Sequence, residues 1–402
     1  MNPGPQVWIV IARPDRLPAA LLTAEILGDL FPGGCRLIRE RSEWWDRIPS
    51  ELYVAHFASI HDFDRIEKCR GLRDLPRLYR AYAHRQRALK ELPVTADTDA
   101  FVVLGGTLSI ANAAISAHPT ARKILVSGRH AYDEITREID RYRYRFTTSS
   151  WFENRVVERL TGVERTLNLK PRKNPGGDGV RISRLERNAA EIYDAIVIVS
   201  QSGTELPRQR SPQMVTSLHP RIADLQRAEE PVPAGTRRVI FFGTPFLLIH
   251  NLEPTVYVEH LDRCLDYLRE HYGAACRLIY RPHPVETDEV NRLQLDGFEI
   301  ENDRAAAEVY MLQYYPEIEA VFSVSSTVSR SALNNGLNGY SLWRVFPFPA
   351  TAAQFFERLM GDVPIEFDIR DLSQRPLHYV QRQHADTAEN AFPLVLRRAV
   401  TR

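Results

Sequence analysis

The sequence is poor in cysteine, has almost no net charge and contains no long apolar run. Its four cysteines are scattered along the chain without a Cys-x-x-Cys pair. This pattern excludes a disulfide framework or a cysteine-rich zinc site and is typical of a reducing cytoplasm. No segment approaches the roughly 18 consecutive apolar residues of a membrane-spanning helix. A formal net charge of +1 provides no general attraction to nucleic acid, so we expect no nucleic-acid partner.

The amino terminus also lacks the features of a signal peptide, namely a basic segment followed by a long apolar core. Residues 7–12 are better explained as a first strand. Apolar residues make up 44% of the chain and charged residues 26%, which is ordinary for a globular protein. We therefore expect a cytoplasmic protein, for which peripheral attachment to the inner face of a membrane stays open.

Short apolar runs alternate with amphipathic stretches along the chain, a pattern that predicts an α/β fold with parallel sheets. At 402 residues the chain exceeds the usual size of one domain. The strands that we expect in the first half are residues 7–12, 35–38, 52–57, 100–105, 123–128 and 195–200. Those expected in the second half are residues 239–243, 278–280, 298–300, 320–324 and 342–346.

A linker at residues 228–236 combines charge, prolines and a glycine, and a new strand follows it directly. We therefore predict an amino-terminal, acceptor-side domain of residues 1–230 and a nucleotide-sugar-binding domain of residues 237–384. Residues 385–402 are predicted to form a helix that packs back on the first domain. Two doubly wound, Rossmann-like domains facing a central cleft make a GT-B-like fold, which many glycosyltransferases, some epimerases and some kinases share.

Three polar segments follow expected strands of the second domain. The first is Arg281-Pro-His-Pro284, in which prolines restrict the backbone on both sides of His283. An imidazole held in this way can donate to a phosphate oxygen and, when protonated, offset the charge of a leaving nucleotide. A purely structural turn is the alternative. Glu286, close by, is expected either to bind cytosine or ribose or to face solvent.

The second segment is Ser325, Ser326 and Thr327, which stand between an expected strand and an expected helix. Hydroxyls and backbone amides at a helix amino terminus can hold a phosphate, and they can equally serve as a simple helix cap. The third segment is Gly243 and Thr244, where the backbone can approach a nucleotide closely or form only a tight turn. Because the three segments follow successive strands of one predicted domain, we expect them to form a phosphate site.

The three segments follow one another in the order strand with glycine, Arg-Pro-His-Pro, and Ser-Ser-Thr before a helix. In this order of motifs the chain resembles bacterial sialyltransferases of the polysialyltransferase and lipooligosaccharide sialyltransferase families. Residues 7–24 are similar to the opening strand and turn of those families. The resemblance implies that the His-Pro pair and the serine pair contact the CMP part of a CMP-sialic acid donor. We assign to this nucleotide site, with His283 as a catalytic residue, Gly243, Thr244, Arg281, Pro284, Glu286, Ser325, Ser326 and Thr327.

The resemblance also implies an activity, that of an inverting glycosyltransferase. The enzyme would move sialic acid or a related keto-sugar acid from a CMP-sugar donor to a glycan or glycolipid acceptor, in capsule or lipooligosaccharide biosynthesis. We predict no metal site and no cofactor besides the donor substrate. Two alternatives also use cytidine nucleotides, a CDP-polyol glycerophosphotransferase and a Kdo transferase. An alternative of another class is a catalytically inactive GT-B protein that binds nucleotide or glycan.

The chain departs from those families at the acidic motif that supplies their general base. Residues 127–129, which read Ser-Gly-Arg, stand at the strand end where that motif is expected. A carboxylate or a neutral histidine can act as a base once it is positioned, so the candidates are His130, Asp133 and Glu134. The two carboxylates can instead stabilise a helix amino terminus electrostatically.

Two further segments are notable for their composition. Residues 137–152 are basic and aromatic, which fits an anionic acceptor groove, a contact with an anionic membrane, or merely a solvated helix face with its own ion pairs. Residues 166–187 are rich in proline, glycine and cations, so we expect an exposed, mobile loop there.

Overall fold

The structure is a computed structural model, and it describes residues 4–66, 75–95, 98–105, 109–128, 144–146, 167–171, 180–182, 193–199, 213–215, 235–244, 252–283, 286, 291–302, 305–324, 326–360, 363–376 and 392–401. The chain divides into two compact units, whose longest parts are Met1–Ile198 in unit 1 and Val215–Phe392 in unit 2. Pro393–Arg402 returns to unit 1. Within the described ranges, no helix combines the length and the apolar character needed to cross a bilayer.

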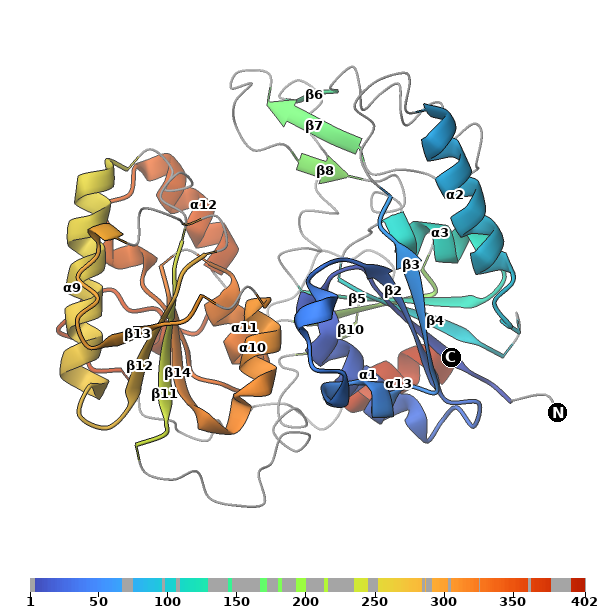
Figure 1. Cartoon of the computed structure of the whole chain (residues 1–402), viewed down its shortest axis with the longest axis horizontal. Helices are drawn as coiled ribbons and strands as arrows, with labels where there is room; N and C mark the ends of the chain where they lie inside the picture. The colour runs from blue at the N-terminus through green and yellow to red at the C-terminus, as the bar shows by residue number, and fades with distance from the viewer. Residues whose placement is uncertain are drawn as a thin grey trace. The chain divides into compact units, whose positions relative to one another are not determined.

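Unit 1 is built on a seven-stranded sheet of order β10-β9-β5-β4-β1-β2-β3 (Figure 1). Its strands are β1 (Val7–Ile11), β2 (Cys35–Arg41), β3 (Ser59–Asp64), β4 (Ala100–Leu104), β5 (Arg122–Gly128), β9 (Ala195–Val199) and β10 (Gln213–Val215). β1 pairs in parallel with both β2 and β4. Every residue of β1 and β4 is buried, as is usual for parallel strands that helices cover on both faces.

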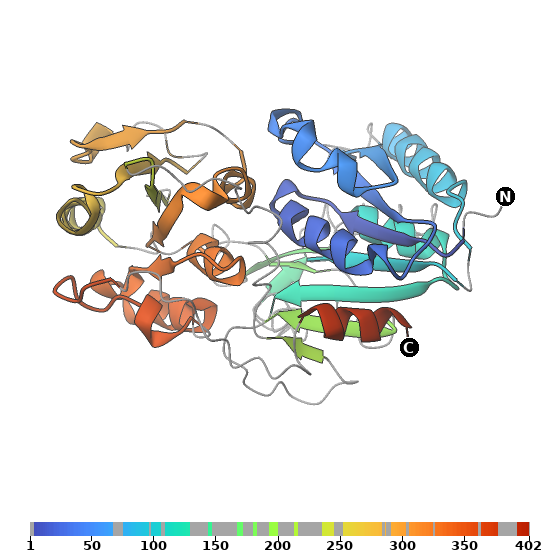
Figure 2. The same cartoon turned by 90° about the horizontal axis from the view of Figure 1, so that it is seen from below.

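Helices pack against this sheet. They are α1 (Leu17–Gly28), α2 (Leu75–Lys90), α3 (Ser109–Ala117) and α13 (Phe392–Thr401). Ile110 of α3 and Leu89 of α2 share one core cluster with Trp8 of β1. The helix α13 contacts α1, because Arg397 Nε donates to the carbonyl oxygen of Ile26 at 3.1 Å. Figure 2 shows α13 beside the strands of unit 1.

A separate antiparallel sheet of order β6-β7-β8 contains β6 (Tyr144–Phe146), β7 (Leu167–Pro171) and β8 (Val180–Ile182). We expected a loop at residues 166–187, but two parts of this range, β7 and β8, are strands. For residues 137–152 a helix face was one alternative, but β6 within this range is a strand. In β7, Leu167 and Leu169 alternate with Asn168 and Lys170, which is the period of a strand. This alternation is short, and the nearby prolines and glycines favoured a loop prediction instead.

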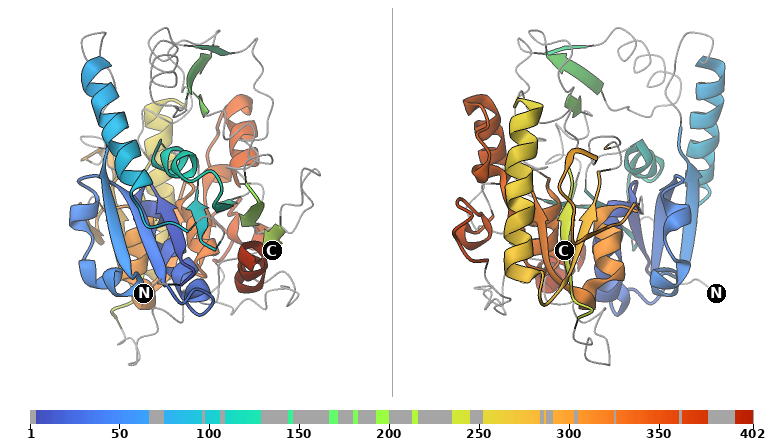
Figure 3. Two further views of the ribbon diagram at one scale, coloured as in Figure 1. Left: turned by 90° about the vertical axis from the view of Figure 1, so that its right-hand side faces the viewer. Right: turned by 60° about the vertical axis from the view of Figure 1, so that its left-hand side comes forward.

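Unit 2 contains a five-stranded sheet of order β13-β12-β11-β14-β15, with every pair parallel (Figure 3). Its strands are β11 (Arg238–Phe242), β12 (Arg277–Arg281), β13 (Phe298–Ile300), β14 (Ile318–Ser323) and β15 (Gly339–Ser341). Its helices include α9 (Pro254–Tyr272), α10 (Ala307–Gln313), α11 (Val328–Asn334) and α12 (Ala350–Met360).

Side chains of β11 alternate between two cores. Val239 and Phe241 share a cluster with residues of α9 and α12, whereas Ile240 and Phe242 share one with residues of α10 and α11. Helices therefore cover both faces of this sheet, which makes unit 2 doubly wound. The prediction of an α/β fold with two doubly wound, Rossmann-like domains is confirmed. Most of the predicted linker, residues 228–236, lies outside the described residues.

Two expected strands are wrong. Residues 52–57 are not a strand, because 3-10 turns cover Ser50–Leu52 and Val54–His56, and β3 follows at Ser59–Asp64. As the edge strand, β3 mixes polar with apolar residues and lacks the continuous apolar run of a central strand. In residues 342–346 the amide of Leu342 still donates to the carbonyl of Ser323 at 3.0 Å, but the 3-10 turn Trp343–Val345 then ends the pairing, and the apolar side chains pack in the core.

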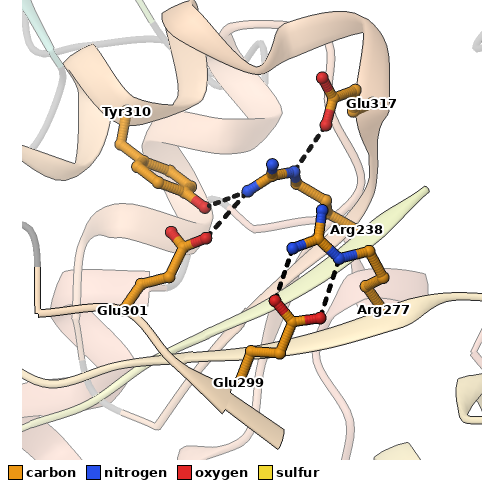
Figure 4. A network of polar contacts seen from close by, with 6 residues as sticks. All are labelled: Arg238, Arg277, Glu299, Glu301, Tyr310 and Glu317. Carbon is orange, nitrogen blue, oxygen red and sulfur yellow. Dashed lines mark hydrogen bonds and ion pairs between the residues drawn. The ribbon is translucent and has the colours of Figure 1, made fainter. Parts of the chain in front are cut away.

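Charged side chains near the amino ends of β11 and β12 tie several elements of unit 2 together (Figure 4). Arg238 donates to Glu317 at 2.6 Å, to Glu301 at 3.0 Å and to the hydroxyl of Tyr310 at 3.0 Å. The hydrogen bonds from Arg277 lower the pKa of Glu299. The contacts of Arg238 link the start of β11 to the residue after β13, to α10 and to the turn before β14, so the network holds these elements of unit 2 together.

Candidate functional site

The carboxyl edge of the second sheet brings the three predicted segments together. Phe242, the last residue of β11, is in register with Arg281 of β12 on one side and with Ser323 of β14 on the other. The residues that follow these strands therefore start side by side. The chain order of the strands reverses between β11 and β14, and ligands of doubly wound sheets bind outside the carboxyl ends at such a switch point.

Gly243 follows β11 in a position that admits no side chain. Its amide donates to the carbonyl of Arg281 at 2.9 Å. A Cβ at this residue would lie 2.2 Å from Glu286 Oε2 and 2.8 Å from the hydroxyl oxygen of Tyr280. Glycine is therefore required here by the close approach of a buried carboxylate, a neighbour that the sequence did not reveal.

Glu286 does not face solvent, since its side chain is only 6% exposed. One carboxylate oxygen accepts a hydrogen bond from the hydroxyl of Tyr280 at 2.9 Å, and the other accepts from the backbone amide of His283 at 2.7 Å. The amide of Glu286 donates in turn to the carbonyl of His283 at 2.7 Å. Glu286 thus stabilises, through hydrogen bonds to backbone groups of His283, the turn that carries this residue.

His283 stands two residues beyond β12 and is partly buried. Burial lowers the pKa of its imidazole below the usual value, because a charged ring loses hydration there. The ring is consequently neutral near pH 7 in the absence of a ligand. A neutral imidazole can donate one hydrogen bond and accept another, and a bound anion would favour its protonation.

Thr244 supplies an unsatisfied polar group at the same edge. Its side chain is 8% exposed, and Oγ1 finds no hydrogen-bond partner in the described part of the chain. Thr23 Oγ1 and Ser341 Oγ also have no partner in the described ranges, so it is the position of Thr244 beside the switch point that makes its hydroxyl notable. A ligand oxygen at the switch point would satisfy this hydroxyl.

The serines after β14 are partly engaged with the protein itself. The buried Ser323 Oγ donates to the carbonyl of Ser326 at 3.1 Å, and Ser326 Oγ accepts from the amide of Val328 at 3.3 Å. The second contact is a capping interaction, which agrees with the structural alternative for this segment. The Ser326 hydroxyl keeps its own proton to donate, and Thr327 is exposed. Ser323, the last residue of β14, was not among the predicted site residues, because the sequence does not show that its hydroxyl reaches Ser326.

Arg281 is buried against aromatic rings. Its Cζ lies 3.9 Å from the ring centroid of Tyr310 and 5.5 Å from that of Phe242, and Nη2 donates to the carbonyl of Ala305 at 3.3 Å. These contacts make it a buried cation on the α10 face of the sheet. Its positive charge lies at the end of β12, beside the predicted phosphate site.

Several predicted site residues lie outside the described residues. They are His130, Asp133, Glu134, Pro284 and Ser325. Their assignments stay predictions. Ser127 is described, and it is buried at the end of β5.

Sequence reasoning also missed a carboxylate in unit 1. In the first sheet the chain order of the strands reverses between β1 and β4. Asp15 follows β1 at this switch point. Asp15 lies 3.3 Å from Arg13 Nε and 3.7 Å from Arg16 Nε. The side chain of Arg16 also lies against Gly105, which follows β4 and has a φ of +62°. The search for polar residues directly after expected strands, which identified the segments of unit 2, could also have identified this cluster.

Asp62 with Asp64 and Asp97 with Asp99 have an Asp-x-Asp spacing, and Asp97 lies outside the described residues. The carboxylate of Asp99 accepts from Trp8 and from the amides of Gln6 and Thr95, a structural role. Asp62 is paired with Arg39. Within the described ranges, no three histidine, cysteine or acidic side chains are grouped to hold a metal ion.

Comparison with known proteins finds no matching family model and no matching curated protein. Solved structures that are similar include UGT73P12 of Glycyrrhiza uralensis with glycyrrhetinic acid 3-O-monoglucuronide, at 11% identity and a TM-score of 0.48, covering 99% of this chain and 90% of that one. An α-2,3-sialyltransferase of Photobacterium phosphoreum matches at 11% and 0.43, covering 90% and 97%. UDP-GlcNAc 2-epimerase of Neisseria meningitidis with UDP-GlcNAc matches at 12% and 0.43, covering 84% and 81%. Likeness of this size does not transfer an activity between proteins.

Proposed function

We propose that the protein is a GT-B glycosyltransferase that transfers an acidic sugar from a CMP-sugar donor to a glycan or glycolipid acceptor. The observation that carries the proposal is the register of β12, β11 and β14 at the switch point of the second sheet, where the hydroxyl of Thr244 has no partner among the described residues. A phosphate oxygen is the complementary ligand for such a group of donors. The motif resemblance supplies the cytidine nucleotide and the acidic sugar.

In the proposed reaction, the acceptor hydroxyl oxygen bonds to the anomeric carbon of the donor sugar. The bond from that carbon to the phosphate oxygen breaks, and CMP leaves with the bonding electrons. His283 and the hydroxyls of Thr244 and Ser326 donate to the phosphate as its charge grows. The acceptor proton passes to a general base, for which His130, Asp133 and Glu134 are candidates.

A screen of nucleotides tests the class of donor. We expect CMP to raise the melting temperature of the full chain more than UMP, UDP, GDP or ADP at equal concentration. A ligand that binds only the folded state stabilises it by about 2.7 kcal/mol when present at 100 times its Kd. Selective stabilisation by UDP or GDP would overturn the CMP-sugar assignment. No response to any nucleotide would favour a protein without this donor site.

A Thr244→Val variant tests the hydroxyl itself. Valine has nearly the same shape, so the unliganded protein should melt at the same or a slightly higher temperature, because a buried unpaired hydroxyl is removed. The affinity for CMP should fall about five- to tenfold, which corresponds to one neutral hydrogen bond. Calorimetric titration with CMP measures the loss. An unchanged affinity would exclude Thr244 from the phosphate site.

A second candidate function is transfer of a polyol phosphate from a CDP-polyol. The neutral imidazole of His283 favours it, because a neutral histidine near pH 7 can serve as a general base. Assays with CMP-sialic acid and CDP-glycerol as donors separate the two. Release of CMP from CDP-glycerol alone would replace the first proposal with the second.

A further inference from the structure

A second candidate binding site in unit 1 is lined by residues of the edge strand β3 and of the helix α2. Figure 1 labels both elements. The cavity there has a volume of about 590 Å³. This is within the range of roughly 300–1,000 Å³ that is typical of small-molecule sites. Phe63 of β3 and Leu78 of α2 contribute apolar side chains to its lining.

The helix α2 presents a row of basic side chains to this cavity. Arg77, Arg80 and His84 are spaced three and four residues apart, so they lie on one helix face, and all three line the cavity and are exposed. Arg65, just beyond β3, adds a further cation to the lining. In the described ranges, no hydrogen bond or ion pair engages Arg80 or His84.

The acidic residues of the lining already have partners on β2. Arg39 Nη2 donates to Asp62 at 3.2 Å, and Arg41 lies 3.8 Å from a carboxylate oxygen of Asp64. Neither arginine of β2 lines the cavity. The lining holds four arginines, Arg65, Arg77, Arg80 and Arg85, against these two carboxylates, so its formal charge is positive.

Arg85 forms a rigid part of the same wall. Its side chain is 3% exposed and donates to Glu40 at 3.0 Å and to the carbonyl of Asp64. These contacts bind α2 to the carboxyl ends of β2 and β3. The mutual positions of the row on α2 and of Arg65 are thereby held before any ligand arrives, which lowers the entropic cost of binding.

We infer that this cavity binds an anionic sugar of one or two rings. Its phosphate or carboxylate group is held by Arg80 and His84 with Arg77, and an apolar ring face packs on Ile66 and Ala81, which are partly exposed in the lining. Arginine recognises both anions through its planar pair of donors. The inference goes beyond the proposed function, because the site belongs to unit 1 and requires no nucleotide.

The test is calorimetric titration of the full chain with glucose 6-phosphate, glucuronic acid, glucose and inorganic phosphate at low ionic strength. We expect saturable binding of at least one of the two anionic sugars and none of glucose. The two anionic sugars distinguish a phosphate from a carboxylate ligand. Inorganic phosphate that binds as tightly as glucose 6-phosphate would overturn the inference of a sugar, as would absence of binding by both anionic sugars.

Matched variants locate the binding. Arg80→Ala should weaken binding of the anionic sugar at least tenfold, whereas Arg87→Ala, an exposed arginine of α2 outside the cavity lining, should change it less than twofold. Arg80→Lys should retain part of the affinity. His84→Ala is an independent variant should Arg80→Ala fold poorly. Equal effects of Arg80→Ala and Arg87→Ala would overturn the site, and unaltered CMP binding in Arg80→Ala separates this result from the proposed function.

Discussion

Gly243→Ala is expected to abolish detectable CMP binding and to lower the stability of the protein. The added Cβ would lie 2.2 Å from Glu286 Oε2, and Glu286 is held by Tyr280 and by the His283 amide, so the carboxylate must move. Overpacking a buried site costs about 1–3 kcal/mol. Moving Glu286 also releases the turn that carries His283. Thermal melting and calorimetric titration with CMP measure the two effects.

Gly28→Ala is the matched control. Gly28 is the last residue of α1, and a Cβ there meets no other atom within 4 Å. Alanine at a compatible position is neutral or stabilises by up to about 1 kcal/mol, because it restricts the unfolded chain. If Gly243→Ala melts and binds CMP as Gly28→Ala does, the close approach to Glu286 does not constrain the site.

A double variant distinguishes the clash from other effects of alanine. Glu286→Ala alone leaves the Tyr280 hydroxyl without its carboxylate partner and should destabilise the protein. In Gly243→Ala/Glu286→Ala the clash is absent, so the double variant should be more stable than the sum of the single effects indicates. Strict additivity would mean that the two residues do not interact as the geometry requires.

His283→Ala is expected to lower kcat of sugar transfer by about 100-fold or more while the protein remains folded. Removing one donor that stabilises a developing oxyanion costs about 100- to 1,000-fold in well-studied enzymes. Folding should survive, because Glu286 holds this turn through backbone groups of His283. His283→Gln keeps a donor and should retain more activity. Unchanged turnover of His283→Ala would remove this residue from the mechanism.

The pH dependence of His283 follows from its lowered pKa. An unfolded histidine titrates near pH 6.5, whereas burial makes the folded protein take up this proton only at lower pH. The unfolded state therefore binds more protons between those two pKa values. The stabilising contribution is complete above about pH 6.5 and is lost as the pH falls through the folded pKa. Denaturation of the parent protein and of His283→Gln across this range should diverge accordingly.

The same titration distinguishes the two candidate reactions. A bound phosphate favours the imidazolium and raises the pKa of His283, so the affinity for CMP should increase as the pH falls toward the pKa of the free protein. If His283 only donates to the phosphate, protonation does not inhibit transfer. If it is the general base of a phosphotransferase, activity falls as the ring becomes protonated. The pH profile of kcat/KM therefore decides between the roles.

Several central features followed from local patterns. The strands β1, β4, β11, β12 and β14 were predicted within one or two residues of their observed bounds at most ends. Such strands are buried on both faces, so they require uninterrupted apolar runs, which are visible in the sequence. Gly243, the Pro-His-Pro unit and the serine segment mark the ends of three of these runs, so their placement at the carboxyl edge was also predictable.

Two edge strands, β3 and β15, were less predictable, although the edge strand β13 was predicted with its observed bounds. β3 and β15 each pair with one strand, β15 having only a single bridge, Ser341 to Asp368, on its other side, and neither has a continuous apolar sequence. At Gly339, which begins β15, a Cβ would lie 1.9 Å from the carbonyl oxygen of Ser329. That contact joins residues of α11 and β15, so the strand's position depends on tertiary packing that local propensity does not contain.

By itself, the sequence determined the alternating α/β class, the two-domain organisation and the strand ends on which His283, Thr244 and Ser326 stand. These properties depend on periodicity and on residues that terminate strands, which act over a few neighbours. Only the tertiary structure decided that β11 lies between β12 and β14 and that Glu286 packs behind Gly243. It alone also formed the cationic cavity between β3 and α2. Strand order and side-chain burial result from contacts between distant residues, which no local pattern records.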